Sequence, residues 1–478
     1  MSLKKYDVII IGGGVVGSAI ARELAHYRLK IAILEKEAEL AFGISKSNSG
    51  IIHPGTQNPP DSLKGKLCVR GNQLVRNIAR ELGVDFKEVG ELIVAFSQED
   101  LTRLKQIKES AECLGVKGLK FVDRLWLKEN EPNLSKEIIG ALYAPTAGII
   151  SPYRFVYDLS ENAKDNGVNI FTNTEVQNIN VLAKKSFQIN TQNILFQTNY
   201  IINAAGLYAD KIAGLVGIND FKITPRKGEE YLLDKKQAYI SNHLIFPLPH
   251  KKSKGILIIK TADGNPMVGP TACDIEDKDD TSTTAEGIEE VFNAAEKMIP
   301  QIQRRHVIAY FAGLRPVSGD DFIIRYEDTV PGFITVAGIQ SPGLTAAPAI
   351  AEMVRDLLKT HGLTLNKKLI FQKFRQKTAH LFAVSLKKAE KLIRKKAEYG
   401  DIVCRCEMVS AQEIQDAIKR GACTLDGVKF RTRAGAGRCH GGFCTCRILK
   451  ILTKQLKVDV TKISKKGKGS ELIISKTR

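Results

Sequence analysis

The alternation of apolar and polar positions is clearest at the start of the chain. An apolar run at residues 8–11 is followed by a glycine cluster, by apolar residues at helical spacing through residue 24, and by a second apolar run that ends at Glu35. A continuous apolar run bounded by turn residues is typical of a buried strand. The pattern therefore predicts a strand, a tight turn, an amphipathic helix and a second strand, which together form a βαβ unit.

The glycine cluster has the spacing G-x-G-x-x-G at Gly12, Gly14 and Gly17. In such a turn the first glycine permits the tight bend, the second lets the backbone approach a pyrophosphate, and the third lets helix and strand pack closely. Glu35, 18 residues after Gly17, is placed to accept hydrogen bonds from an adenosine ribose. The unit is therefore predicted to bind a dinucleotide.

Three later segments favour FAD as that dinucleotide. Residues 43–55 form a small and polar loop, residues 201–210 a strand that ends in small residues, and residues 332–353 a strand, a Pro-Gly loop and an Ala-rich helix. Small residues at a strand end let a backbone come close to a cofactor, and a helix N-terminus favours an anion above it.

The remaining pattern predicts a second sheet and a connector. Strand-like runs at residues 231–233, 256–260 and 322–325 are expected to build a mixed sheet over the flavin. Residues 366–400 are expected to form a charged helical connector, with apolar residues on one stripe and lysines elsewhere. We find no internal repeat.

Composition places the chain among ordinary globular proteins. It has 478 residues, 43% of them hydrophobic and 26% charged, which excludes a disordered or fibrous protein and implies several domains. No apolar run is long enough to span a bilayer and no signal-like stretch precedes the first strand, so we expect a cytoplasmic protein. Of the net charge of +19, +14 lies in residues 378–478. That basic surface suits an anionic membrane or an acidic partner, or it is a solvated tail; we expect no nucleic acid.

Six of the nine cysteines lie between residues 404 and 446, which in an intracellular chain indicates metal binding. A Cys-x-Cys pair and a Cys-x4-Cys pair stand 32 residues apart, with a capping box at Ser410 and Glu413 and a helix end at Gly421 between them. Neighbouring arginines favour thiolates and an anionic cluster. Zinc is the alternative metal, although this spacing departs from the usual zinc pattern.

Taken together, these segments resemble the glycine and D-amino-acid oxidase-like superfamily of FAD-dependent oxidoreductases over about residues 5–360. Residues 48–55, 62–68, 226–231 and 263–270 are similar to the L-2-hydroxyglutarate oxidase branch. Residues 404–446 resemble the iron-sulfur tail of the anaerobic glycerol-3-phosphate dehydrogenase large subunit, which the hydroxyglutarate oxidases lack. The two ends of the chain therefore favour different substrates.

The resemblance implies an α/β fold, α+β overall. A Rossmann-like FAD-binding domain (1–90, 146–220 and 331–365) is interleaved with a mixed-sheet substrate domain (91–145 and 221–330), within an oxidoreductase region of residues 1–365. The tail, 401–478, resembles the bacterioferritin-associated ferredoxin (BFD) type. It implies a [2Fe-2S] cluster on Cys404, Cys406, Cys439 and Cys444, with Cys446 as the alternative ligand and Cys423 as a core residue. The expected FAD contacts are Gly12, Gly14, Gly17, Glu35, Lys36, Ser45, Asn48, Ser49, Val176, Ala205, Gly206, Gly343, Leu344 and Thr345.

Oxidation of an alcohol at a flavin needs a base for the hydroxyl proton and a group that holds the substrate's anion. His53 is the one histidine in a cofactor loop and is our candidate base, or else it only hydrogen-bonds the loop or flavin. Arg315 offers a two-pronged fork for a carboxylate or phosphate, its alternative role being an ion pair. Lys260, at a strand end, is a candidate second cation for the substrate or an ordinary surface lysine.

A flavin joined to an iron-sulfur centre suits electron delivery to a carrier, so the sequence predicts a dehydrogenase. The tail favours sn-glycerol 3-phosphate as the substrate, oxidised to dihydroxyacetone phosphate. The alternatives are an L-2-hydroxy acid such as 2-hydroxyglutarate, an amine or amino acid, or a redox subunit without catalysis. We expect electrons to pass to partner subunits or to the quinone pool, and association with the inner face of the membrane through those partners.

Overall fold

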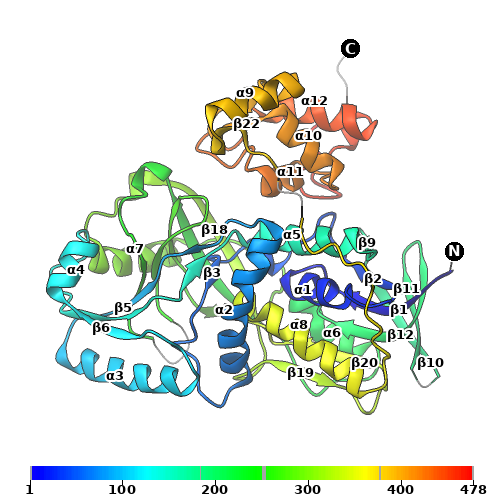
Figure 1. Ribbon diagram of the computed structural model, residues 1–478, viewed down its shortest axis with the longest axis horizontal. Coiled ribbons are helices and arrows are strands. Elements are labelled where there is room, and N and C mark those ends of the chain that lie inside the picture. Colours follow the sequence, from blue (N-terminus) through cyan, green and yellow to red (C-terminus); the bar gives the residue numbers. More distant parts are fainter. Residues whose placement is uncertain (1–2, 184, 250–253, 376–377, 476–478) are drawn as a thin grey trace.

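The computed structural model describes residues 3–183, 185–249, 254–375 and 378–475. Its first layer is an eight-stranded sheet built on the predicted βαβ unit (Figure 1). Strand β1 lies between β12 and β2, and β9 and β20 extend this parallel centre on either side. Its strands are β1 (Leu3–Ile11), β2 (Ile31–Leu34), β9 (Asn169–Phe171), β10 (Val176–Ala183), β11 (Ser186–Thr191), β12 (Leu195–Asn203), β19 (Ile323–Tyr326) and β20 (Phe333–Ala337).

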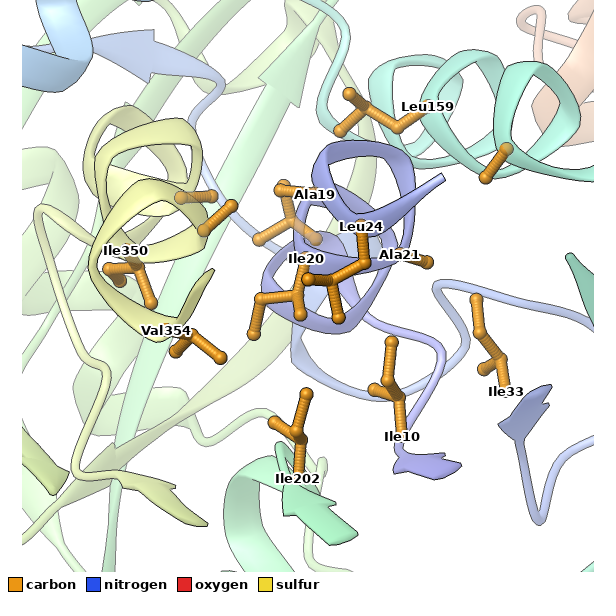
Figure 2. Close-up of a cluster of buried hydrophobic side chains, with 14 of the residues drawn as sticks. Ile10, Ala19, Ile20, Ala21, Leu24, Ile33, Leu159, Ile202, Ile350 and Val354 are labelled. Carbon is orange, nitrogen blue, oxygen red and sulfur yellow. The ribbon is translucent and has the colours of Figure 1, made fainter. Parts of the chain in front are cut away.

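Helices cover both faces of this sheet. On one face α1 (Val15–Leu24) packs between α5 (Pro152–Asp165) and α8 (Gly343–Thr360), and α2 (Leu63–Leu82) packs on α8. Figure 2 shows Ile10, Ile33 and Ile202 of the strands pointing at side chains of these helices. The other face packs apolar side chains that include those of α6 (Ala209–Gly214). Burial of these apolar surfaces holds the parallel strands in place, so that their carboxyl ends lie at one edge of the sheet.

A nine-stranded mixed sheet lies beside the first. Its order is β17-β13-β16-β15-β14-β5-β7-β6, with β18 on the other edge of β13. The strands are β5 (Glu91–Ala95), β6 (Lys120–Asp123), β7 (Gly140–Ala144), β13 (Thr224–Leu233), β14 (Leu244–Phe246), β15 (Leu257–Lys260), β16 (Pro266–Gly269), β17 (Cys273–Asp274) and β18 (Val307–Val317), and the helices around it are α3 (Gln98–Cys113), α4 (Arg124–Asn130) and α7 (Ala285–Met298). A small sheet of β3 (Ile51–Ile52), β4 (Lys87–Glu88) and β8 (Gly148–Ile149) stands apart from both.

One strand differs from the prediction. The run at residues 322–325 was expected in the mixed sheet, but it forms β19, which pairs with β20 in the first sheet. Only residues 327–332 separate the two strands, so they form an antiparallel hairpin. This short connection therefore places β19 in the same sheet as β20.

The C-terminal residues form a separate small core. It contains β21 (Ile402–Cys404), β22 (Val409–Ser410), α10 (Ala411–Lys419), α11 (Leu425–Thr432) and α12 (Thr445–Leu456). The predicted capping box is present, because Ser410 and Glu413 each accept from the other's backbone N–H. In the described part of the connector the α-helix is α9 (Leu386–Lys395), with short 3-10 turns at Leu381–Ala383 and Ala397–Tyr399. Residues 366–375 instead bond to the first domain, as when Lys368 N donates to His26 O.

Buried ion pairs hold this C-terminal module on the rest of the protein, where α11 packs against α5 (Figure 1). Arg431 Nη1 lies 2.7 Å from Glu39 Oε2, and Glu39 is 1% exposed. Arg433 Nη1 lies 3.0 Å from Asp263 Oδ2, while Glu407 of the module itself lies 3.0 Å from Arg433 Nε. Removing one partner of such a pair leaves an uncompensated buried charge, so these contacts fix the module in place.

Every helix among the described residues is too short or too polar to cross a membrane.

Candidate active site and cysteine centre

A cavity of about 430 Å³ opens at the carboxyl ends of β1, β2 and β20. Ile11, Leu34 and Ala337, the last residues of these strands, all line it. Ligands of open α/β sheets bind outside the carboxyl ends of the strands, where the sheet order reverses. The first sheet therefore places this cavity where a dinucleotide is expected.

The three glycines of the turn have different structural roles. Gly12 has φ +109°, and a Cβ on it would lie 2.4 Å from Ala204 O; a Cβ on Gly17 would lie 2.0 Å from Gly12 O. Gly14 has an extended backbone that any residue could adopt, and its Cβ would meet only Ser45 Oγ, at 3.2 Å. Gly12 and Gly17 thus allow the turn itself, whereas Gly14 leaves space in the cavity. That space fits a pyrophosphate next to the N-terminus of α1.

Backbone N–H groups hold Glu35 in the cavity wall. Gly13 N donates to Glu35 Oε2 at 2.8 Å, and Glu37 N donates to Oε1 at 2.9 Å. Burial raises the pKa of Glu35 above its usual range, and these two hydrogen bonds act against that rise. The carboxylate is therefore oriented before any ligand binds, as a ribose acceptor requires.

The structure brings most of the predicted cofactor residues to this cavity. The following line it: Gly12, Gly14, Glu35, Lys36, Ser45, Asn48, Ser49, Val176, Ala205, Gly206, Gly343 and Leu344. Gly17 and Thr345 are not among the described lining residues. Thr345 is fully buried, and its Oγ1 accepts from His53 N at 2.9 Å. It therefore supports the loop that carries His53.

His53 lies in the same cavity among three polar side chains. Its Nδ1 is 3.4 Å from Lys254 Nζ and 3.9 Å from Glu91 Oε2, and its Nε2 is 3.4 Å from Ser341 Oγ. Burial and the positive charge of Lys254 lower the pKa of His53 to about 4, while Glu91 acts in the opposite direction. The imidazole is therefore neutral near pH 7 and able to accept a proton.

Lys260 as a substrate ligand stays a prediction. It is not among the described residues that line the cavity, whereas Lys254, just before the same strand, is. The start of β15 faces the cavity, and Thr261 to Asp263 after its end face the C-terminal module. The direction of β15 decides which lysine reaches the site, and the sequence pattern does not reveal that direction.

Arg315 lines the cavity from β18 beside Glu230 of β13. Arg315 Nη2 donates to Thr271 O at 2.6 Å, which orients the guanidinium, and burial lowers its pKa to about 10. Burial raises the pKa of Glu230 to about 7. Ser49 Oγ donates to Glu230 Oε1 at 3.1 Å, and Oε2 is buried with no hydrogen-bond partner among the described residues.

Glu91, Glu230, Lys254 and Ser341 were not found from the sequence. Glu230 and Ser341 lie within segments that the sequence indicated, residues 226–231 and 332–353. No local motif marks the four side chains themselves. The cavity thus combines a neutral imidazole, two cations and a carboxyl group that is poised between its two protonation states. Such a set can remove a hydroxyl proton and hold an anion.

The four cysteines predicted as ligands come together in two pairs. Cys406 Sγ lies 3.6 Å from Cys439 Sγ, and the buried thiols of Cys404 and Cys444 interact with each other and with this pair. Among the described residues, no three His, Cys, Asp or Glu side chains surround a single metal-ion position. Partial burial disfavours ionisation of Cys439, but hydrogen bonds from Cys406 and from the backbone of residues 441–443 lower its pKa. Thiolate ligands on an anionic cluster need this kind of environment.

The other two C-terminal cysteines lie differently. Cys446 is exposed on the first turn of α12. Cys423 is half-buried where the C-terminal module meets the first domain, with its Sγ 3.6 Å from Ala38 O. It is an interface residue as well as a packing one.

The chain matches two protein-family models. Residues 7–357 match the FAD dependent oxidoreductase (DAO) model, and residues 402–454 match the BFD-like [2Fe-2S] binding domain. A glycerol 3-phosphate dehydrogenase of Caloramator mitchellensis is 42% identical over 478 residues, covering 99% of each chain. A glycerol 3-phosphate oxidase of Mycoplasma genitalium is 33% identical over 77% of this chain and 97% of its own.

Solved structures agree with these matches. The FAD-bound, dithionite-reduced L-α-glycerophosphate oxidase of Mycoplasma pneumoniae has a TM-score of 0.74 and 33% identity, and covers 78% of this chain and 98% of its own. The oxidases match the part of the chain that contains the cavity, and the BFD-like model matches the part that contains the cysteine pairs. The chain therefore belongs to the DAO family of FAD-dependent oxidoreductases and carries a C-terminal BFD-like domain, with FAD and a [2Fe-2S] cluster as its cofactors.

Proposed function

We propose that this protein oxidises sn-glycerol 3-phosphate to dihydroxyacetone phosphate and passes the electrons through its [2Fe-2S] cluster to a partner. The observation that carries the proposal is a cavity lined by a neutral imidazole, by Lys254 next to it, and by Arg315. A base and a doubly cationic pocket suit a substrate with a secondary hydroxyl group and a phosphate. The full-length similarity to a glycerol 3-phosphate dehydrogenase, tail included, supports this substrate over an L-2-hydroxy acid.

His53 has the role of the base in this proposal. Bound FAD supplies the acceptor for the hydride from C2 of the substrate, and His53 takes the proton from the C2 hydroxyl group. The imidazolium that forms lies 3.9 Å from the buried Glu91 carboxylate. A buried carboxylate stabilises a positive charge strongly because little water screens the interaction.

Arg315 and Lys254 have the role of holding the phosphate. Hydrogen bonds from the guanidinium to backbone carbonyls, such as that to Thr271 O, fix its orientation. A fixed fork binds two oxygens of a phosphate at a smaller loss of side-chain entropy than a free side chain. Glu230, with a pKa near 7, can donate a hydrogen bond to the substrate when it is protonated.

The test is an anaerobic titration of the holoprotein that follows the flavin absorbance. Glycerol 3-phosphate should bleach the flavin at micromolar to millimolar concentration, with dihydroxyacetone phosphate as the product. L-2-hydroxyglutarate and amino acids should bleach it far less. Stronger bleaching by a 2-hydroxy acid would assign the pocket to the hydroxyglutarate branch, and no bleaching by any of them would favour a redox subunit without catalysis.

Changing Arg315 to Lys should raise the KM for glycerol 3-phosphate by about tenfold or more, because the charge stays and the fork is lost. FAD content should stay normal, since the guanidinium contacts no residue of the glycine turn. Steady-state kinetics with an artificial acceptor measure the effect. An unchanged KM would assign Arg315 to the structure of the sheet and reopen the choice of substrate.

Changing Glu91 to Gln tests its role as a positioning residue. Glu91 raises the pKa of His53, so its neutral replacement should lower that pKa further and make the base weaker. We expect kcat to fall by roughly 10-fold or more. The acid limb of kcat/KM should move to lower pH, because His53 must be unprotonated to act. Thr56→Val is the matched control: it removes the hydrogen bond to Glu91 Oε1 but keeps the carboxylate, so its acid limb should stay. A lower kcat with an unmoved limb in Glu91→Gln would mean a structural role only.

In this proposal, electrons leave the protein through the C-terminal module. Cys406 is exposed, and Phe443, between two candidate ligands, is 88% exposed. A partner subunit that receives electrons is expected to contact this edge, and association with the inner face of a membrane through such a partner stays a prediction.

A further inference from the structure

A second cleft, of about 1040 Å³, lies between the flavin cavity and the C-terminal module. Residues 42–49 form one wall, and Ile308, Tyr310, Ala312 and Leu314 of β18 form another. Gly313 and Arg315, the intervening residues of β18, line the flavin cavity instead. The two spaces therefore lie on opposite faces of one strand. The C-terminal module closes the cleft with residues of α11, with Ala436 and His440, and with residues 466–468.

Three lysines from different parts of the chain line this cleft: Lys46 before β3, Lys429 on α11, and Lys466 in the tail. None of them has a carboxylate oxygen within 4.0 Å among the described residues. Burial lowers the pKa of both Lys46 and Lys429, and the charge of Lys466 acts in the same direction on Lys46. Two carboxylates act against this charge, Asp426 on both lysines and Glu37 on Lys46, so they offset two of the three positive charges. Lys46, Lys429 and Lys466 therefore form a lysine cluster with an excess of positive charge. The cluster is partly shielded from water.

Aromatic rings lie next to the lysines. Phe430 stands edge-on to Phe42 at 5.8 Å and lies 4.9 Å from the ring of Tyr153. Lys46 Nζ lies 4.4 Å from the centre of the Phe42 ring. Tyr310, on the β18 wall, is 55% exposed. The cleft therefore has aromatic side chains next to its lysines, and Tyr310 offers the most exposed ring among them.

We propose that this cleft binds a nucleotide, with the Lys46, Lys429 and Lys466 cluster on its phosphates and the aromatic side chains against its ring. Clustered cations are suited to phosphate oxygens, and aromatic rings to a heterocycle. The three lysines lie outside the flavin cavity, although the two spaces share the wall formed by residues 43–44 and 47–49. The cleft adjoins the [2Fe-2S] site, because His440, which lines the cleft, follows the candidate ligand Cys439. The proposal does not depend on the identity of the oxidised substrate.

The test uses the full-length protein with FAD and cluster bound. Isothermal titration calorimetry with ADP, NAD⁺, FMN and inorganic pyrophosphate distinguishes the sources of the phosphate. At least one nucleotide should bind with a micromolar Kd that weakens as salt is raised. Pyrophosphate should bind at least about tenfold more weakly, because it lacks a ring.

The double variant Lys429→Ala/Lys466→Ala should weaken that nucleotide by about tenfold or more, while FAD absorbance and activity with an artificial acceptor stay unchanged. Lys105→Ala, an exposed lysine on α3, is the matched control and should bind as the unmodified protein does. Lys429→Gln keeps the size of the side chain and should weaken binding without affecting the fold. Three outcomes would overturn the proposal: no nucleotide binds, the lysine variants bind equally well, or pyrophosphate binds as tightly as every nucleotide.

Discussion

Protein with Val in place of Gly14 is expected to fold and to contain no FAD. A Cβ at Gly14 meets only Ser45 Oγ, at 3.2 Å, and its backbone is extended, so the fold accepts a side chain there. The added methyl groups would point into the part of the cavity that fits the pyrophosphate. Absorbance near 450 nm after purification should fall to background, and activity should be lost with it. Circular dichroism and the melting temperature, compared with apoprotein, report the fold.

Gly17→Ala separates this effect from a general intolerance of the turn. A Cβ there would lie 2.0 Å from Gly12 O, so the turn itself must shift. We expect loss of stability or of soluble protein, rather than folded apoprotein. If Gly14→Val kept its flavin, the pyrophosphate would have to bind elsewhere in the cavity.

Replacing Cys404 by Ser should remove the cluster and leave flavin reduction by substrate intact. Cys404 is 1% exposed and lies with Cys444 in one of the two thiol pairs, and these pairs lie apart from the flavin cavity. Protein prepared without oxygen should contain about two irons and two acid-labile sulfides per chain, as expected for a [2Fe-2S] cluster, and the variant almost none. Transfer of electrons to the natural acceptor should be abolished, because the proposed route out of the flavin runs through the cluster.

Cys446→Ser is the matched control, since Cys446 is exposed and stands two residues from Cys444. It should keep its iron and sulfide. Loss of the cluster in Cys446→Ser would make Cys446 a ligand, and stoichiometric zinc without labile sulfide in the unmodified protein would replace the electron relay with a structural metal site.

The sequence predicts the parts of the site that are local. The turn at Gly12, Gly14 and Gly17, the strand before it and the acid after the second strand lie within about thirty residues, so a single pattern contains them. The cysteine pairs and the capped helix between them are local in the same sense. Family likeness added distant cofactor residues, such as Val176 and Gly343, that line the cavity.

The polar groups around His53 could not be found in this way. Glu91, Lys254 and Ser341 come from the mixed sheet, from the approach to β15 and from the loop after β20, and each contacts the histidine only because two sheets pack together. An apolar run such as that at residues 256–260 predicts a strand but not its direction or its neighbours. The pattern therefore indicates Lys260, at the strand end, and gives no sign of Lys254.

β15 also constrains the chain in a way that relatives can reveal. Lys254, before the strand, contacts the histidine of the flavin cavity, and Asp263, after it, holds Arg433 of the C-terminal module. Adding or removing one residue between them would turn every side chain of the strand to the opposite face and break one of the two contacts. Related chains that make both contacts should therefore keep the two residues nine positions apart. Those without the module are free to vary it.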